Sequence, residues 1–388
     1  MRPIRSKECE RAVCCVLGPV KSGTTMLISL LDDHPALSAF PMEVKFLTHW
    51  IERFDRVEGK ATGKATYEAL NGFFFKQSKI RLMDQGGEGL ADIMNSGRID
   101  FTNFDFKKFR AIQISNAKNA EVRELSGRAL FRRYFRDIHD ALEITRGRKG
   151  LEVIVSKEGN HGAKHISTIL AHFPHAKFIV VVRDPRDIYV SLKSIARKKR
   201  AGLDSPSFKE LVTPASFIIG NQDKNILAFS KVYEKYRDDR QFHFVRYEAL
   251  VADPAREMGL ISSFLEIDND LVLQKPTNFG QPWKGNASSM NEMSGISTTR
   301  TNKWKKDLTN NESELLEHGF GKYLRQGDYG LSGRKTNQIR FVVFVVASEV
   351  EALMTHWTWS RRSMKNGIKH FLVAIRAIRE GARIVRNG

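Results

Sequence analysis

Short apolar runs separated by helical patterns organise most of the chain. Runs rich in aliphatic and β-branched residues occur at residues 12–17, 151–155, 178–182 and 242–245, and runs of this kind predict buried strands. Between them, apolar residues recur every three to four positions, as in residues 161–173, which predicts an amphipathic helix. Strands that alternate with helices favour a parallel β-sheet flanked by helices. We therefore expect an α/β fold.

The first expected strand leads through a glycine-containing loop into an expected helix. The loop, residues 18–25, reads Gly-Pro-Val-Lys-Ser-Gly-Thr-Thr, and apolar residues at helical spacing follow it. A strand, a loop and a helix in this order direct backbone N–H groups and a helix N-terminus at a phosphate. The candidate phosphate ligands are Lys21, Ser22, Gly23, Thr24 and Thr25.

This loop departs from the usual nucleoside-triphosphate loop. The Walker pattern requires Gly-Lys-[Ser/Thr] at the start of the helix, with the hydroxyl group on Mg²⁺. Here Thr24 follows Gly23, and the lysine lies two residues before the glycine. Lys21 is therefore expected within the loop, within reach of a bridging or leaving oxygen.

A second segment also carries residues suited to binding an anion. Residues 178–182 are followed by Arg183-Asp184-Pro185. A helix should begin there, because Asp is a good N-cap residue and Pro a good first helical residue. Arg183 at the strand end and Ser191 on the helix face could then converge on one anion.

Together these segments resemble sulfotransferases that use 3′-phosphoadenosine 5′-phosphosulfate (PAPS). The loop around Lys21 resembles their 5′-phosphosulfate loop, and Arg183 and Ser191 match the pair that holds the 3′-phosphate in that family. The resemblance covers roughly residues 11–330, and we expect residues 1–330 to form the catalytic domain.

Two later segments extend the resemblance. Tyr247 lies in a segment that looks like the strand, turn and helix found late in these enzymes, and residues 297–308 resemble their basic lid loop. The lid usually contains Gly-Arg-Trp, whereas this chain has Asn302-Lys303-Trp304. Because of this difference, the sequence does not identify the cation that contacts the 3′-phosphate. The candidate nucleotide-binding residues of the lid are Arg300, Lys303 and Trp304.

The resemblance implies metal-free transfer of a sulfuryl group from PAPS to an acceptor hydroxyl. Lys21 would stabilise the leaving phosphate, while Thr24, Thr25 and nearby backbone N–H groups would bind the 5′-phosphate. Sulfuryl transfer, like phosphoryl transfer, depends on such positioning and electrostatic stabilisation.

Glu43 is the predicted general base. It stands where glycan-modifying members of the family carry a catalytic glutamate, and apolar neighbours in residues 40–47 could desolvate it and raise its pKa. The alternative for Glu43 is an ion pair with Lys45. The alternative candidates for the base are His161 and His165, which could also form a metal-binding pair. No further metal ligands accompany them, so the favoured interpretation is that they are histidines on a helix surface.

The expected acceptor is a carbohydrate or glycolipid, by resemblance to the same members of the family. Residues 51–150 are expected to form an acceptor-side insertion, but the sequence does not reveal which acceptor is used. Lys157 follows an expected strand end and is a further acceptor-side candidate.

The charge of the chain is strongly positive, at +19. Residues 331–388 hold eleven Lys and Arg against three Glu, a net charge of +8, and we expect them to form a basic helical extension. Residues 364–386 place apolar side chains along one stripe and cations elsewhere, which is typical of either an interfacial helix on an anionic membrane or an ordinary docking helix. Nucleic acid is the disfavoured partner.

The cysteine content favours a cytoplasmic protein. Cys14 and Cys15 are adjacent in an expected strand, so their side chains should point to opposite faces, and no disulfide framework follows. The first strand is expected by residue 12, from which we expect no leader before it.

Two other classes of function stay open on the sequence. A P-loop nucleotide or small-molecule kinase would depend on ATP and Mg²⁺. A non-catalytic basic protein that binds membranes or nucleic acid would lack affinity for adenosine 3′,5′-bisphosphate.

Overall fold

The structure is a computed structural model. It describes residues 12–39, 103, 105–119, 127–141, 153–160, 162–201, 213–221, 225–283 and 295–333. Glu43, His161, much of the expected insertion and nearly all of the expected extension lie outside these residues, so the predictions for them are not examined by the structure.

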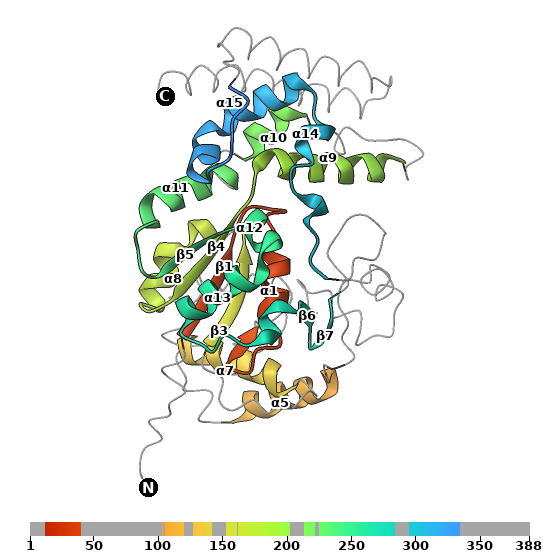
Figure 1. Cartoon of the computed structure of the whole chain (residues 1–388). Helices are drawn as coiled ribbons and strands as arrows, with labels where there is room; N and C mark the ends of the chain where they lie inside the picture. The colour runs from red at the N-terminus through yellow and green to blue at the C-terminus, as the bar shows by residue number, and fades with distance from the viewer. Residues whose placement is uncertain are drawn as a thin grey trace, which may run out of the picture. The chain divides into compact units, whose positions relative to one another are not determined.

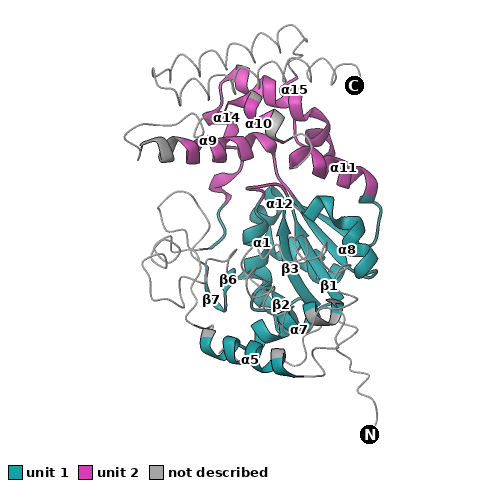
Figure 2. Ribbon diagram, turned by 180° about the vertical axis from the view of Figure 1, so that it is seen from behind, with its two compact units in different colours: residues 1–18, 23–181, 236–297 teal, residues 19–22, 182–235, 298–388 magenta. Residues whose placement is uncertain are grey.

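The chain forms two compact units, which Figure 2 colours separately. Unit 1 comprises residues 1–18, 23–181 and 236–297. Unit 2 comprises residues 19–22, 182–235 and 298–388. Residues 19–22 of the loop after the first strand belong to unit 2, and the residues on either side of them belong to unit 1.

A five-stranded sheet confirms the expected α/β fold (Figure 1). Its strands are β1 (Ala12–Leu17), β2 (Leu37–Ala39), β3 (Val153–Gly159), β4 (Lys177–Val182) and β5 (Phe242–Arg246). Their order is β2-β3-β1-β4-β5. β1 pairs in parallel with both β3 and β4, and β2 pairs in parallel with β3.

Strand β3 continues beyond the apolar run that predicted it. The run ends at Val155, but β3 continues to Gly159, and Ser156 and Lys157 pair with Cys15 and Val16 of β1. Lys157 thus lies within the strand and not after its end, which corrects the prediction. Polar residues interrupt the hydrophobic pattern here, but the ladder with β1 satisfies the backbone and extends the strand.

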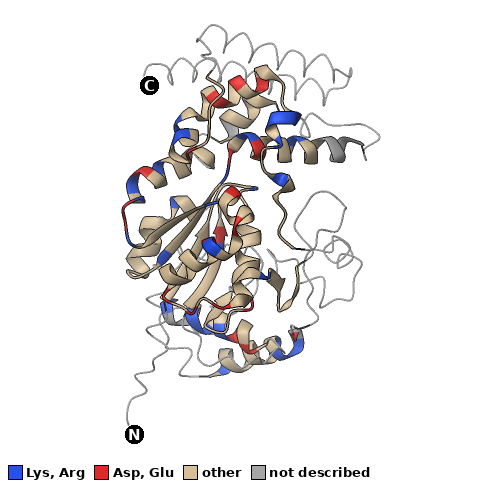
Figure 3. Ribbon diagram, in the orientation of Figure 1, with Lys and Arg blue, Asp and Glu red and all other residues tan. Residues whose placement is uncertain are grey.

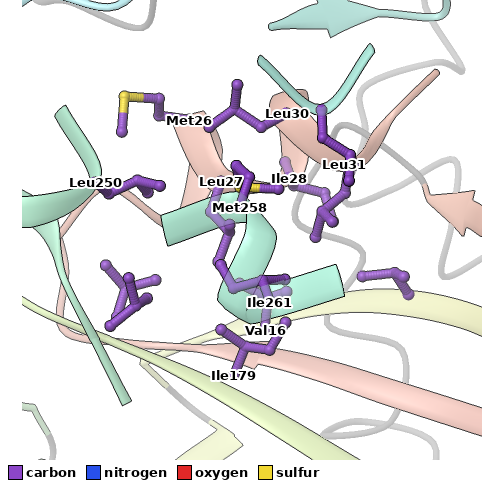
Figure 4. Close-up of a cluster of buried hydrophobic side chains, with 14 of the residues drawn as sticks. Val16, Met26, Leu27, Ile28, Leu30, Leu31, Ile179, Leu250, Met258 and Ile261 are labelled. Atoms are coloured by element: carbon purple, nitrogen blue, oxygen red, sulfur yellow. The ribbon is translucent and has the colours of Figure 1, made fainter. Parts of the chain in front are cut away.

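Helices on the sheet enclose the core of unit 1 (Figure 4). They are α1 (Thr24–Leu31), α12 (Tyr247–Ala252) and α13 (Pro254–Leu265). Leu27 of α1 and Ile261 of α13 are fully buried together with Ile179 of β4. Asp253 caps α13, since its side chain accepts a hydrogen bond from the Arg256 N–H, and Pro254 is the first helical residue.

The remaining elements of unit 1 are η3 (Gly162–Lys164), α8 (Ile166–His172), α5 (Phe106–Lys118), α7 (Gly127–Asp140), η5 (Leu271–Gln274), β6 (Thr277–Asn278) and β7 (Gln281–Pro282). The helix expected at residues 161–173 is thus present as η3 and α8. Cys14 and Cys15 are both free and buried, and burial raises the pKa of the Cys14 thiol to about 12, so these side chains serve the core.

The regular elements in the described part of unit 2 are helices. Its elements are α9 (Pro185–Ala201), α10 (Pro214–Gly220), α11 (Ile226–Tyr236), η6 (Thr298–Arg300), α14 (Trp304–Asp307) and α15 (Asn310–Gln326). Helix α9 begins at Pro185, as predicted. Helix α15 packs on α9 and α10, with the Phe217 and Phe320 rings 5.4 Å apart. Among the described residues, no helix combines the length and apolar character needed to cross a membrane.

Candidate functional site

The loop between β1 and α1 has a backbone that only certain residues adopt. Lys21 and Gly23 have φ angles of +65° and +103°, in the left-handed region that favours glycine. A Cβ atom on Gly23 would lie 2.4 Å from Cδ2 of Tyr247, so the ring at the start of α12 closely covers this glycine. Glycine is therefore required at residue 23 both by its backbone conformation and by the approach of Tyr247.

Ser22 contributes a buried hydroxyl to the loop. Its side chain is 0% exposed, and its Oγ has no hydrogen-bond partner among the described residues. A buried polar atom without a partner is costly, and such atoms in native structures call for a ligand or another unseen partner. The arrangement therefore fits a loop that binds a ligand with hydrogen-bonding oxygens.

A second lysine reaches the start of α1 from strand β3. Lys157 Nζ donates a hydrogen bond to Thr25 Oγ1 at 2.7 Å, and Lys157 is 7% exposed. Lys157, for which an acceptor-side role stays a prediction, contacts Thr25 of the loop at residues 18–25 within unit 1. The carboxyl end of β3 thus brings a largely buried cation to the N-terminus of α1, where an anion is favoured.

In unit 2, Arg183 connects the loop to the lid. Its Nη1 donates to the carbonyl oxygen of Lys21 at 2.7 Å, and its Nη2 donates to the carbonyl oxygen of Arg300 at 2.8 Å. The loop is also held by Asn225, whose Oδ1 accepts the N–H of Val20 at 3.0 Å. Arg183 therefore lies in contact with Lys21 and Arg300, and all three are predicted to bind the nucleotide.

The first turn of α9 makes further contacts with the lid that the sequence did not predict. Asp187 Oδ2 accepts the N–H of Asn302 at 2.7 Å, and Oδ1 accepts the N–H of Trp304 at 2.9 Å. Burial raises the pKa of Asp187, while the Trp304 N–H and the charge of Arg183 oppose this. In sequence, Asp187 is an ordinary acidic residue in a first helical turn, so nothing local pointed to a contact 115 residues away.

Arg186 adds a stacking contact to the same segment. Its guanidinium lies 3.6 Å from the centroid of the Trp304 ring. It also makes ion pairs of 2.7 Å with both Asp184 and Glu317. Burial alone would lower the pKa of Arg186, but its hydrogen bonds and ion pairs with these carboxylates outweigh burial and raise it.

The unusual asparagine of the lid has a structural explanation. Asn302 has a φ angle of +58°, and asparagine enters this region more readily than other residues with a side chain. Cationic residues recur along η6 and α14 on either side of it (Figure 3). Lys303 is exposed and Arg300 is partly exposed.

Ser191 and His165 are two further predicted residues that the structure describes, whereas Glu43 and His161 lie outside the described residues. Ser191 is partly buried on α9, and His165 lies at the N-terminus of α8. Within the described ranges, no group of three or more His, Cys, Asp or Glu residues is arranged to hold a metal ion.

Comparisons with known proteins give the chain its family. A sequence model described as "Sulfotransferase family" matches residues 14–270. The chain is 30% identical over 115 residues to the omega-hydroxy-beta-dihydromenaquinone-9 sulfotransferases of Mycobacterium bovis and Mycobacterium tuberculosis. That match spans 28% of this chain and only 27% of each relative.

Solved sulfotransferase structures also align with the chain. The sulfotransferase domain from the curacin biosynthetic pathway is 16% identical, with a TM-score of 0.47 over 83% of this chain and 99% of that one. A sulfotransferase from Mycobacterium avium is 18% identical, with a TM-score of 0.39 over 84% of this chain and 79% of that one. The family match covers most of the chain and includes the loop, β3, β4 and the whole of α9. The protein belongs to the sulfotransferase family.

Proposed function

We propose that the protein transfers a sulfuryl group from PAPS to a hydroxyl group of an acceptor, without a metal ion. The observation that carries the proposal is the phosphate loop. Its glycine has a left-handed backbone beneath Tyr247, its serine hydroxyl is buried without a described partner, and Lys157 donates to its threonine. Family membership supports PAPS as the donor.

The chain's own residues would divide the work as follows. Lys21 would stabilise the negative charge that develops on the leaving phosphate oxygen, since a fixed cation aimed at developing charge lowers the barrier. Lys157, which donates to Thr25 within unit 1, would stabilise the charge of the phosphate bound at the start of α1. Backbone N–H groups at the start of α1, with Thr24 and Thr25, would bind the 5′-phosphate. Arg183 and Ser191 would bind the 3′-phosphate.

The proposed reaction balances without another reactant. The bond between sulfur and the bridging phosphate oxygen breaks, and a bond between sulfur and the acceptor oxygen forms. Glu43 would take the proton of the acceptor hydroxyl as general base. The products are adenosine 3′,5′-bisphosphate and a sulfate ester.

For the acceptor, we propose a hydroxyl group on a lipid or glycolipid. The mycobacterial relatives are named for a hydroxylated menaquinone derivative, which supports a lipid-borne hydroxyl. The alternative acceptor is a carbohydrate without a lipid, and the acceptor assay below includes both classes.

A donor assay comes first. The protein is titrated with adenosine 3′,5′-bisphosphate and with ATP, each with and without Mg²⁺, in a calorimeter. We expect the bisphosphate to bind without Mg²⁺. Binding of ATP that requires Mg²⁺, with no affinity for the bisphosphate, would instead support a P-loop kinase.

An acceptor assay follows with sulfur-35-labelled PAPS. The panel contains long-chain lipid alcohols, glycolipids, free oligosaccharides and phenols, and the labelled product is identified by mass spectrometry. Lys157→Ala should lower turnover roughly 10²–10³-fold, the range for loss of one donor to a developing oxyanion. Lys164→Ala is the matched control, because Lys164 is an exposed lysine on η3. Equal activity of both variants would remove Lys157 from the mechanism.

A further inference from the structure

The start of α14 is capped by a side chain from a distant helix. α14 has four residues, and Lys303, which precedes it, makes no side-chain cap bond. The first N–H groups of a helix have no partner within the helix itself. Here the Trp304 N–H is bound by Asp187 at 2.9 Å, and the same carboxylate binds the Asn302 N–H at 2.7 Å. Asp187 therefore replaces the local N-cap.

Two neighbouring arginines fix the same stretch of chain. Arg183 holds the carbonyl oxygen of Arg300, and Arg186 stacks on Trp304. Arg186 is 1% exposed and is itself fixed by Asp184 and Glu317. Residues 183–187 of unit 2 therefore contact the lid at its residues 300, 302 and 304.

Glu317 also connects this network to the end of the described chain. Its Oε2 accepts the N–H of Ser332 at 2.9 Å and the Ser332 hydroxyl at 2.6 Å. A truncation meant to preserve the lid should therefore keep Ser332.

We propose that Asp187 is a positioning residue that holds the lid, residues 297–308, in the conformation that binds the 3′-phosphate of the nucleotide. By fixing the Asn302 and Trp304 N–H groups, Asp187 determines where the backbone presents the side chains of Arg300 and Lys303. A pre-organised cationic segment binds an anion more tightly than a free one, because less conformational entropy is lost on binding. The inference rests on the proposed function, since it assigns the lid to the nucleotide.

The test compares two nucleotides that differ only in the 3′-phosphate. Adenosine 3′,5′-bisphosphate and adenosine 5′-phosphate are titrated into the wild type, Asp187→Ala and Asp187→Asn. The wild type should prefer the bisphosphate, and Asp187→Ala should reduce that preference by about tenfold or more, the scale of losing a helix cap. The affinity for adenosine 5′-phosphate should not change. Asp187→Asn should be intermediate, because its amide oxygen still accepts an N–H.

Glu234→Ala serves as the matched control. Glu234 is an exposed carboxylate on α11 paired with Lys322, so its loss changes the net charge of unit 2 equally without touching the lid. We expect this variant to keep the wild-type preference. If it loses the preference as Asp187→Ala does, net charge explains the effect and the inference fails.

Hydrogen exchange gives a second measurement that needs no nucleotide. In Asp187→Ala, the amides of Asn302 and Trp304 should exchange faster than in the wild type. Unchanged exchange, or an unchanged preference for the bisphosphate, would overturn the positioning role. Equal weakening of both nucleotides would do so too, because it indicates a merely structural role. Failure of the proposed function looks different: the wild type itself would then show no preference for the bisphosphate, and the assignment of the lid would fail with it.

Discussion

The carboxylate of Asp137 should make the stability of the protein depend on pH. Asp137 lies on α7 and is 0% exposed. Its Oδ2 accepts hydrogen bonds from Gln113 Nε2 at 2.6 Å and Asn116 Nδ2 at 2.8 Å, both on α5, and its Oδ1 accepts one from Arg133 at 3.0 Å. The side chain therefore joins α5 to α7, two helices of the segment we expect on the acceptor side.

The direction of the pH effect follows from the folded-state pKa. Burial raises the pKa of Asp137 from its ordinary 3.8 to about 6, and the charge and hydrogen bond of Arg133 only partly oppose this. Between these two values the folded protein holds a proton that the unfolded chain has released. The contribution of Asp137 to stability is therefore greatest below about pH 4 and decreases as the pH rises through about 6. Two pKa values this far apart correspond to roughly 3 kcal/mol.

The perturbation is Asp137→Asn, which removes the titration and keeps an oxygen that can accept from α5. We would measure urea unfolding of the variant and of the wild type between pH 4 and pH 7.5. The free energy of unfolding of the variant minus that of the wild type should increase by roughly 2–3 kcal/mol over this range. Taking the difference removes the contribution of every other titrating group that the substitution leaves unchanged.

Asp140→Asn is the control, because Asp140 lies on the same helix with its side chain 44% exposed and a 3.7 Å contact to Arg136. Its difference from the wild type should change with pH far less than that of Asp137→Asn, because the charge of Asp140 is the smallest of the causes that set the pKa of Asp137. The reasoning would be refuted if the Asp137→Asn difference were constant, or if it decreased as the pH rose.

Three further predictions concern the site, and a fourth concerns the C-terminal extension. Gly23→Ala should cost about 1–3 kcal/mol in backbone strain, and the contact with the Tyr247 ring should add to this; a lower melting temperature and weaker bisphosphate binding would be seen, and normal values for both would contradict the loop geometry. Lys21→Ala should lower turnover more than nucleotide affinity, whereas Arg183→Ala should lower affinity by about 1.5–3 kcal/mol; identical affinity losses with normal turnover would refute these roles. Glu43→Gln should keep nucleotide binding and lose roughly 10²–10⁴-fold in turnover, and near-normal activity would move the base to a histidine. A chain ending at Gly333 should keep bisphosphate binding but lose salt-sensitive binding to anionic vesicles, since each Lys or Arg near such a surface contributes about 1 kcal/mol; equal vesicle binding by both forms would exclude the extension as the contact.

The elements that the sequence predicted correctly are those with local signals. β1 is a continuous apolar run, and α9 begins at Pro185 after Asp184, so propensity and capping act within a few residues of the feature. The three-residue β2 is too short to show a periodicity.

Features that depend on distant partners could not be predicted in this way. Strand β3 extends through Lys157 because β1 pairs with it, although the local residues are polar. The contact of Lys157 with Thr25 and that of Asp187 with the lid each join residues more than 100 positions apart. The pattern of apolar and polar residues along the chain does not predict which polar groups the folded chain will bring into contact.

The contacts of the lid with Arg183, Arg186 and Asp187 also bear on the timing of catalysis. A segment held by several contacts opens only when they break together, and in many enzymes such opening limits turnover more than the chemical step does. With the lid bound to the 3′-phosphate as proposed, we expect release of the bisphosphate to be slower than sulfuryl transfer. Tighter nucleotide binding would bring no faster catalysis, and loosening the lid slightly would raise the turnover number while weakening affinity for the donor.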